Sequence, residues 1–193
     1  MTGPRIVLAS TSRYRAALLR RLLDDFEQIA PDVDERSLPD ETPAARASRL
    51  AAAKASVVSE NRRDALVIGS DQVATLGNNI LHKPGSTGNA SHQLRASSGN
   101  HVDFFTGLCV IDGQGSRHAA LDHTRVLFRK LTDAEIDRYI ARERPLDCAG
   151  SFKSEGTGIA LFERIETTDP SALVGLPLIA LARLLRQAGI AVP

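Results

Sequence analysis

A short apolar segment that runs directly into a helical pattern constrains the fold of this chain most. Residues 5–9 have the composition of a strand, and apolar residues then recur at helical spacing from Ala16 to Leu23. Residues 65–68 form another apolar strand, and Thr42-Pro43 supplies the cap and first-turn proline of a helix that should extend to about Glu60. Strands that alternate with helices in this way predict an α/β protein.

The rest of the chain continues this alternation without a linker, repeat or low-complexity tract. Gly113-Gln114-Gly115 is the turn of a long predicted hairpin, and Thr132 with Glu135 forms the capping box of a predicted helix. The further predicted segments are strands at 26–30, 104–112, 118–128 and 159–165, an acidic loop at 31–35, a hairpin turn within 76–81, an irregular loop at 149–156, and helices at 89–97, 132–142 and 177–188.

Length and charge narrow the possible functions. The chain has 193 residues, 42% hydrophobic and 24% charged, so we expect a single folded domain over residues 1–193. A net charge of +1 is too small to hold a nucleic-acid polymer or an anionic membrane, whereas small anions remain suitable ligands. No apolar run approaches the roughly 20 residues of a membrane span, and no signal-peptide pattern opens the chain, so we expect a cytoplasmic protein.

One acid stands where catalytic groups are often found. Asp71 follows a glycine and a serine after the second apolar strand, and we expect it to project from the end of that strand. Lys54 lies on the helix predicted from Pro43, which would hold its ammonium group on a rigid element. Cys109 and Cys148 lack metal-ligand spacing, as do the five histidines, so we expect two buried free thiols and no histidine-bound metal.

Five short motifs occur in a fixed order along the chain: Leu8-Ala9-Ser10-Thr11-Ser12, Ile68-Gly69-Ser70-Asp71-Gln72, Lys83-Pro84, residues 149–156 and residues 173–178. Together they resemble the Maf family of nucleoside-triphosphate pyrophosphatases, and the resemblance spans nearly the whole chain. It implies an α/β fold with a long mixed sheet, flanking helices and a central cleft, similar to that of the inosine-triphosphatase-like enzymes.

The resemblance assigns catalytic roles to four residues. It implies that Asp71 is the proton acceptor that activates the attacking water, and that Lys54 and Lys83 neutralise charge developing on the phosphates. It also implies that Glu35 and Asp71 hold a divalent cation, Mg²⁺ or Mn²⁺, for which carboxylate oxygens are suitable ligands. Taken without the resemblance, Glu35 fits a solvated acidic loop, and both lysines fit the protein surface.

The triphosphate is expected at the first strand-to-helix turn. By resemblance, Ser10 and Arg15 bind it, because free backbone amides and a guanidinium suit a phosphate. The chain has Arg13 where the family usually has proline and Ala16 where a second arginine is frequent, so Arg13 is a further candidate contact. Without the resemblance, this segment fits an ordinary serine-capped helix.

Base recognition is expected from Tyr14, Gln72 and Glu155. Gln72, residues 148–156 and Asp169-Pro170 resemble the branch of the family that hydrolyses 7-methyl-GTP. A 7-methylguanine ring is cationic, so the aromatic face of Tyr14 can stack on it, and the Glu155 carboxylate can accept hydrogen bonds from its Watson–Crick edge. The branch commonly has tryptophan in place of Tyr14.

The resemblance therefore predicts hydrolysis of 7-methyl-GTP to 7-methyl-GMP and pyrophosphate with a divalent metal, which would remove a modified nucleotide from the pool. One alternative is the same chemistry on dTTP or UTP, as in the other well-known branch. A second is a nucleotide-binding regulator of cell division and septum formation with little turnover. Homodimerisation is left open by the sequence.

Overall fold

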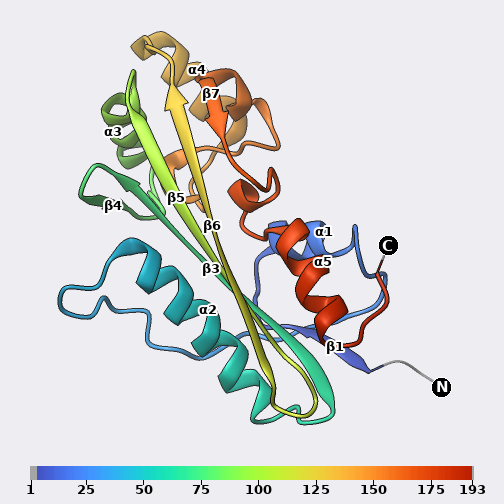
Figure 1. Ribbon diagram of the computed structural model, residues 1–193. Coiled ribbons are helices and arrows are strands. Elements are labelled where there is room, and N and C mark those ends of the chain that lie inside the picture. Colours follow the sequence, from blue (N-terminus) through green and yellow to red (C-terminus); the bar gives the residue numbers. More distant parts are fainter. Residues whose placement is uncertain (1–3, 193) are drawn as a thin grey trace. The chain divides into compact units, whose positions relative to one another are not determined.

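The strands of the computed structural model, which describes residues 4–192, form one mixed sheet of seven strands (Figure 1). Their order is β2-β1-β3-β5-β6-β7, and β4 pairs with β3. β1 is parallel to β2 and β3, whereas β4 is antiparallel to β3 and β7 is antiparallel to β6. The strands are β1 (Arg5–Leu8), β2 (Glu27–Gln28), β3 (Ala65–Leu76), β4 (Asn79–Leu81), β5 (His101–Ile111), β6 (Arg117–Phe128) and β7 (Phe162–Glu166).

The helices begin where the sequence supplies capping groups. Thr42 Oγ1 accepts a hydrogen bond from the Ala45 amide, and Thr132 with Glu135 forms a complete capping box, which confirms both predicted helix starts. The α-helices are α1 (Arg13–Leu19), α2 (Pro43–Ser59), α3 (Thr87–Ser97), α4 (Asp133–Glu143) and α5 (Leu178–Gln187), and the 3₁₀ helices are η1 (Ala149–Ser151), η2 (Thr157–Leu161) and η3 (Ala172–Val174).

The described chain separates into two compact units. The first contains residues 4–72, 106–122 and 169–192, and the second contains residues 73–105 and 123–168. The three long strands β3, β5 and β6 each contribute residues to both units. The mixed sheet with flanking helices confirms the predicted α/β fold, while the single domain and its central cleft stay predictions.

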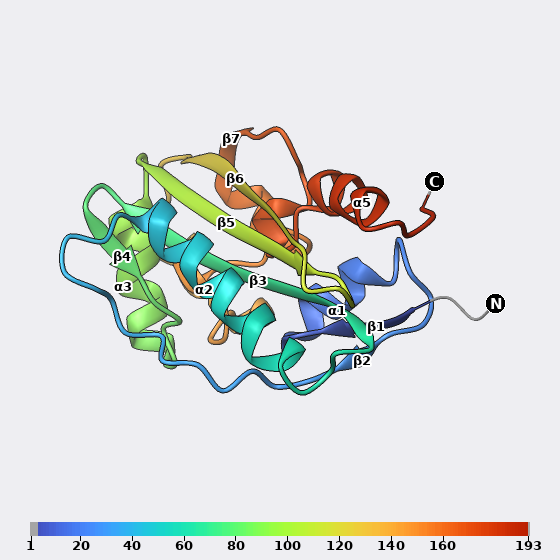
Figure 2. The same ribbon diagram turned by 60° about the horizontal axis from the view of Figure 1, so that its bottom comes forward.

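Within the first unit, helices lie on both faces of the sheet (Figure 2), and alternate strand residues pack against them. Leu8 and Ile68 belong to an apolar cluster with α1 and α5, and Val7 and Val67 belong to a second cluster with α2. This period of two is the pattern expected of strands that are buried on both faces.

Two glycines let α2 lie unusually close to the sheet. A Cβ atom at Gly69 of β3 would stand 2.3 Å from the carbonyl oxygen of Ala51, and one at Gly107 of β5 would stand 2.3 Å from that of Ala47. Any larger residue would push the helix away, because the opposing atoms belong to its backbone. The close approach fixes α2, and with it Lys54, against β3.

The second unit has an aromatic core centred on Phe152. The ring of Phe152 makes edge-to-face contacts with Phe104, Phe128 and Phe162 at centroid distances of 5.3, 5.7 and 4.8 Å. Such pairs add to the stabilisation from burial alone. Phe152 thereby anchors the beginning of the irregular segment that follows η1.

Three sequence expectations need correction. Strand 65–68 does not end before Asp71, because β3 continues to Leu76, where its last residues pair with β4. The strand predicted at 159–165 starts only at Phe162, since the preceding residues form η2. Cys109 is buried as expected, but Cys148 is only half-buried.

Candidate active site

The centre of the site is a buried lysine that contacts two carboxylates. Lys54 Nζ lies 2.6 Å from Asp71 Oδ1 and 2.7 Å from Glu35 Oε1. The Lys54 and Asp71 side chains are only 9% and 10% exposed, whereas that of Glu35 is 58% exposed. A buried ammonium requires such compensation, because an unpaired charge in the interior is costly. The structure thus brings together three of the predicted residues.

Asp71 is a buried acid in the middle of a strand. Its neighbours in β3 satisfy their own polar groups internally, since Ser70 Oγ lies 2.8 Å from the Gly107 carbonyl oxygen and 3.0 Å from that of Gly175. β3 can therefore continue through Ser70, because the hydroxyl finds acceptors on residues that are distant in the sequence. The strand therefore holds the Asp71 backbone on a regular element of the sheet.

The carboxylates suit a divalent cation that is shared with a substrate. Among residues 4–192, no cluster of three or more His, Cys, Asp or Glu side chains is arranged to hold a metal ion. Mg²⁺, however, is commonly held by one or two carboxylates together with substrate phosphates, and Glu35 and Asp71 converge on one nitrogen atom. The donor set fits a cation bound jointly by protein and phosphate.

Arg15 lies in the field of these two carboxylates, and its Nη1 atom is 3.5 Å from Ser10 Oγ. Ser10 Oγ accepts a hydrogen bond of 3.1 Å from the Ser12 amide, and Arg15 Nε donates one of 2.9 Å to the Gly175 carbonyl. Burial lowers the pKa of Arg15, while the Asp71 and Glu35 carboxylates act in the opposite direction. The guanidinium thus lies in the field of the same two carboxylates, where it can pair with an incoming phosphate.

Gln72 is held by the turn that contains η3. Its Nε2 atom lies 2.9 Å from the Ala172 carbonyl oxygen, 3.2 Å from that of Leu173 and 3.0 Å from Thr106 Oγ1. The amide nitrogen therefore binds protein acceptors. Thr106 was missed by the sequence analysis, although a polar residue inside the apolar strand 104–112 is a signal that could have identified it.

Tyr14 and Arg13 contact each other at the start of α1. The Arg13 guanidinium carbon lies 4.8 Å from the centroid of the Tyr14 ring, and Arg13 Nη2 donates a hydrogen bond of 2.8 Å to the tyrosine hydroxyl. Arg13 thus covers part of the aromatic residue that is predicted to stack on the base. The ring already makes a cation–π contact of the kind predicted for a cationic purine.

Lys83 and Glu155 belong to the second unit and are both exposed. The loop that carries Glu155 is fixed to α4: the Lys153 amide donates to the Tyr139 hydroxyl at 2.9 Å, and the Thr157 amide donates to Glu143 Oε1 at 2.8 Å. Glu143 gave no signal in the sequence, because its partner lies on a different element.

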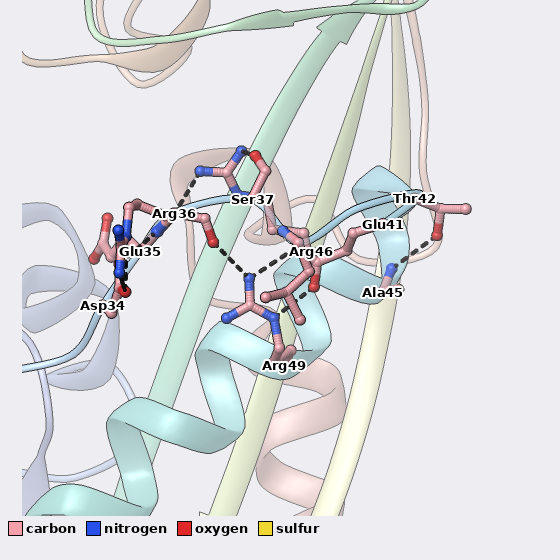
Figure 3. A network of polar contacts seen from close by, with 10 residues as sticks. Asp34, Glu35, Arg36, Ser37, Glu41, Thr42, Ala45, Arg46 and Arg49 are labelled. Atoms are coloured by element: carbon pink, nitrogen blue, oxygen red, sulfur yellow. Dashed lines mark hydrogen bonds and ion pairs between the residues drawn. The ribbon is translucent and has the colours of Figure 1, made fainter.

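The loop that carries Glu35 is bound to α2 by a network that the sequence analysis also missed (Figure 3). Arg46 and Arg49 of α2 reach residues of the loop, and Glu41 accepts from Arg49. The first unit contains the predicted site residues Ser10, Arg15, Glu35, Lys54, Asp71 and Gln72.

A family model and curated relatives both match nearly the whole chain. The family model described as Maf-like protein matches residues 5–188. A protein of Xanthomonas axonopodis pv. citri (strain 306) named 7-methyl-GTP pyrophosphatase is 55% identical over 190 residues, which cover 98% of this chain and 100% of that protein. A protein of the same name from Burkholderia pseudomallei (strain 1710b) is 54% identical over 96% of this chain and 88% of its own length.

Solved structures share the fold at low sequence identity. The Staphylococcus aureus Ham1 protein aligns with a TM-score of 0.54 and 13% identity over 95% of this chain and 99% of its own. A HAM1 protein from Coxiella burnetii aligns with a TM-score of 0.51 and 15% identity over 96% of this chain and 100% of its own. No helix within residues 4–192 is both long and apolar enough to span a membrane.

Proposed function

Because the chain belongs to the Maf family and its relatives are named 7-methyl-GTP pyrophosphatase, we propose that it hydrolyses 7-methyl-GTP to 7-methyl-GMP and pyrophosphate. The observation that carries this proposal is the buried Asp71 carboxylate, paired with Lys54 beside the more exposed Glu35. We also propose that it acts in the cytoplasm, which would suit a nucleotide substrate of this kind.

The residues of the first unit supply the groups that hydrolysis needs. Ser10 and Arg15 bind the triphosphate, and the Asp71 carboxylate takes a proton from water as the water oxygen bonds to the α-phosphorus. The bond between the α-phosphorus and its bridging oxygen to the β-phosphate breaks, and pyrophosphate leaves with that oxygen. Lys54 offsets the charge that develops on the phosphate oxygens. Because its ammonium group is already held in place, little reorganisation of the protein is required during the reaction.

The proposed divalent cation would be held by Glu35 and Asp71. It would supply charge neutralisation on the phosphates and lower the pKa of a bound water. Lys83, Tyr14, Gln72 and Glu155 keep the roles that the family resemblance assigns to them: Lys83 in charge neutralisation and the other three in base recognition.

The test is pyrophosphate release from 7-methyl-GTP, GTP, dTTP and UTP by the wild type and by Asp71→Asn. The wild type should prefer 7-methyl-GTP, and the variant should fold normally but lose about 10²-fold to 10⁴-fold in rate, the usual contribution of a general base. Preference for dTTP or UTP would indicate the pyrimidine alternative, and the absence of turnover on all four would favour a nucleotide-binding regulator. Near-normal turnover by folded Asp71→Asn would contradict the role of Asp71.

A further inference from the structure

Two arginines of α2 bind consecutive carbonyl groups of the loop that carries Glu35 (Figure 3). Arg46 Nη2 donates a hydrogen bond of 2.8 Å to the carbonyl oxygen of Glu35 itself, and Arg49 Nη2 donates one of 3.1 Å to that of Arg36. Residues 29–42 contain no helix or strand that could order this segment by itself. The position of Glu35 therefore depends on contacts with α2.

Glu41 orients the second of these arginines. Its carboxylate accepts from Arg49 Nε at 2.5 Å and from Arg49 Nη2 at 2.8 Å, and its side chain is only 6% exposed. The same carboxylate accepts from the Leu38 amide at 3.2 Å, so it also joins the turn at the end of the loop. A bidentate arginine–carboxylate pair fixes direction as well as distance. Arg49 is thereby aimed at the loop backbone.

Arg46 binds the loop through its two terminal nitrogens, while its Nε atom makes no hydrogen bond to the described residues. Its Nη1 atom donates to Ser37 Oγ at 2.6 Å, but its Nε atom is buried and has no hydrogen-bond partner among the described residues. An unsatisfied buried donor in a native fold calls for an explanation. The two contacts made by its terminal nitrogens, both to the loop, provide one.

We propose that Arg46 and Arg49 are positioning residues that fix the loop backbone so that the Glu35 carboxylate meets Lys54 beside Asp71. α2 then contacts Glu35 in two places: Arg46 binds its backbone carbonyl, and Lys54 binds its side-chain carboxylate. The inference rests on the proposed function only for the divalent cation. The two arginines would hold its proposed ligand Glu35 in place without touching the cation.

Whether loss of an arginine weakens or tightens cation binding distinguishes a positioning role from a purely electrostatic one. An arginine repels a nearby divalent cation, so removing its charge should tighten cation binding if charge alone matters. Removing a group that orients a metal ligand should weaken binding instead, commonly by about 10-fold to 100-fold. The two explanations therefore predict opposite changes for Arg49→Ala.

Arg36→Ala is the matched control. It also removes one positive charge, here from the loop itself, but the Arg36 side chain pairs with the exposed Asp34, and the carbonyl that Arg49 binds is retained in the variant. Arg49→Lys is a second variant, which keeps the charge but cannot reproduce the planar, bidentate pair with Glu41. It therefore tests geometry even if Arg49→Ala does not fold.

The experiment measures Mn²⁺ affinity by electron paramagnetic resonance, with α,β-methylene-GTP present, and amide hydrogen exchange of residues 34–38 in the metal-free protein. Arg46→Ala, Arg49→Ala and Arg49→Lys should weaken Mn²⁺ binding about 10-fold or more and should speed exchange in the loop, whereas Arg36→Ala should do neither. If the Arg46 and Arg49 variants match Arg36→Ala in both readouts, the inference is wrong. A different result would be loss of loop protection in the Arg46 and Arg49 variants of a protein whose wild type releases no pyrophosphate from any nucleotide, because it would support the positioning role of the two arginines and contradict the proposed function.

Discussion

At the scale of single residues, the site is organised around a lysine rather than an acid. Lys54 is buried between Asp71 and Glu35, and its ammonium can neutralise a phosphate oxygen as a compact charge. The carboxylates differ in exposure, so Asp71 is shielded from solvent while Glu35 is reached by it. This difference fits the proposed roles, in which the shielded Asp71 takes the proton and the more exposed Glu35 joins it in holding a cation.

The Glu41–Arg49 pair also makes a prediction about pH. The hydrogen bonds from Arg49 lower the pKa of Glu41 from 4.5 to about 2. A carboxyl group whose pKa is lowered by folding contributes stability that is complete above its unfolded pKa and is lost as the pH falls through its folded pKa. The stabilisation that Glu41 provides should therefore persist through neutral pH and disappear between pH 4.5 and about 2.

Urea denaturation of the wild type and Glu41→Gln at several pH values checks this expectation. The difference in free energy of unfolding should be constant above about pH 5 and should shrink below that value. A difference that grows as the solution is acidified would show that Glu41 does not stabilise the fold as an ionised group.

At the scale of elements, the distance between α2 and the sheet decides whether the charged residues meet. Lys54 lies on α2 and Asp71 on β3, and Gly69 is the point at which a side chain would strike the helix backbone. α2 also carries the arginines that hold the Glu35 loop. One helix therefore positions both Lys54 and the Glu35 loop relative to Asp71 on β3.

Gly69→Ala should separate these parts. The added methyl group would stand 2.3 Å from the Ala51 carbonyl oxygen, so α2 must move away from β3. We expect a loss of about 1–3 kcal/mol or more in the free energy of unfolding, as for other overpacked cores, together with a fall in turnover.

Gly113→Ala is the control for this substitution, since its Cβ atom would make only an ordinary contact of 3.5 Å with the Arg63 carbonyl oxygen. Thermal melting and pyrophosphate release of the two variants should be compared. Equal stability and activity in Gly69→Ala and Gly113→Ala would mean that the close approach of α2 is not required.

At the scale of the whole molecule, local signals in the sequence were reliable where one segment determines its own structure. Thr42 and the Thr132–Glu135 pair marked helix starts, because capping groups lie within a few residues of the amides they bind. The family resemblance likewise pointed to Asp71 and Lys54, which contact each other in the structure.

Features that depend on distant partners could not be predicted. The extension of β3 through Ser70 and Asp71 needs acceptors and donors from Gly107, Gly175 and Lys54, none of which adjoins them in the chain. The contacts of Arg46 and Arg49 with the Glu35 loop could not be predicted for the same reason, because arginines are mostly exposed and nothing near them in the sequence marks the two that bind the loop. Periodicity identifies a face of a helix but not its partner.

The central claim, that water attacks the α-phosphorus with Asp71 as the base, is tested most directly by the fate of the water oxygen. Hydrolysis of 7-methyl-GTP in ¹⁸O-labelled water, followed by mass spectrometry of both products, reports which phosphorus was attacked. The proposed mechanism predicts the label in 7-methyl-GMP, unlabelled pyrophosphate, and neither product in quantity from Asp71→Asn. Label in pyrophosphate, or release of orthophosphate with 7-methyl-GDP, would contradict it.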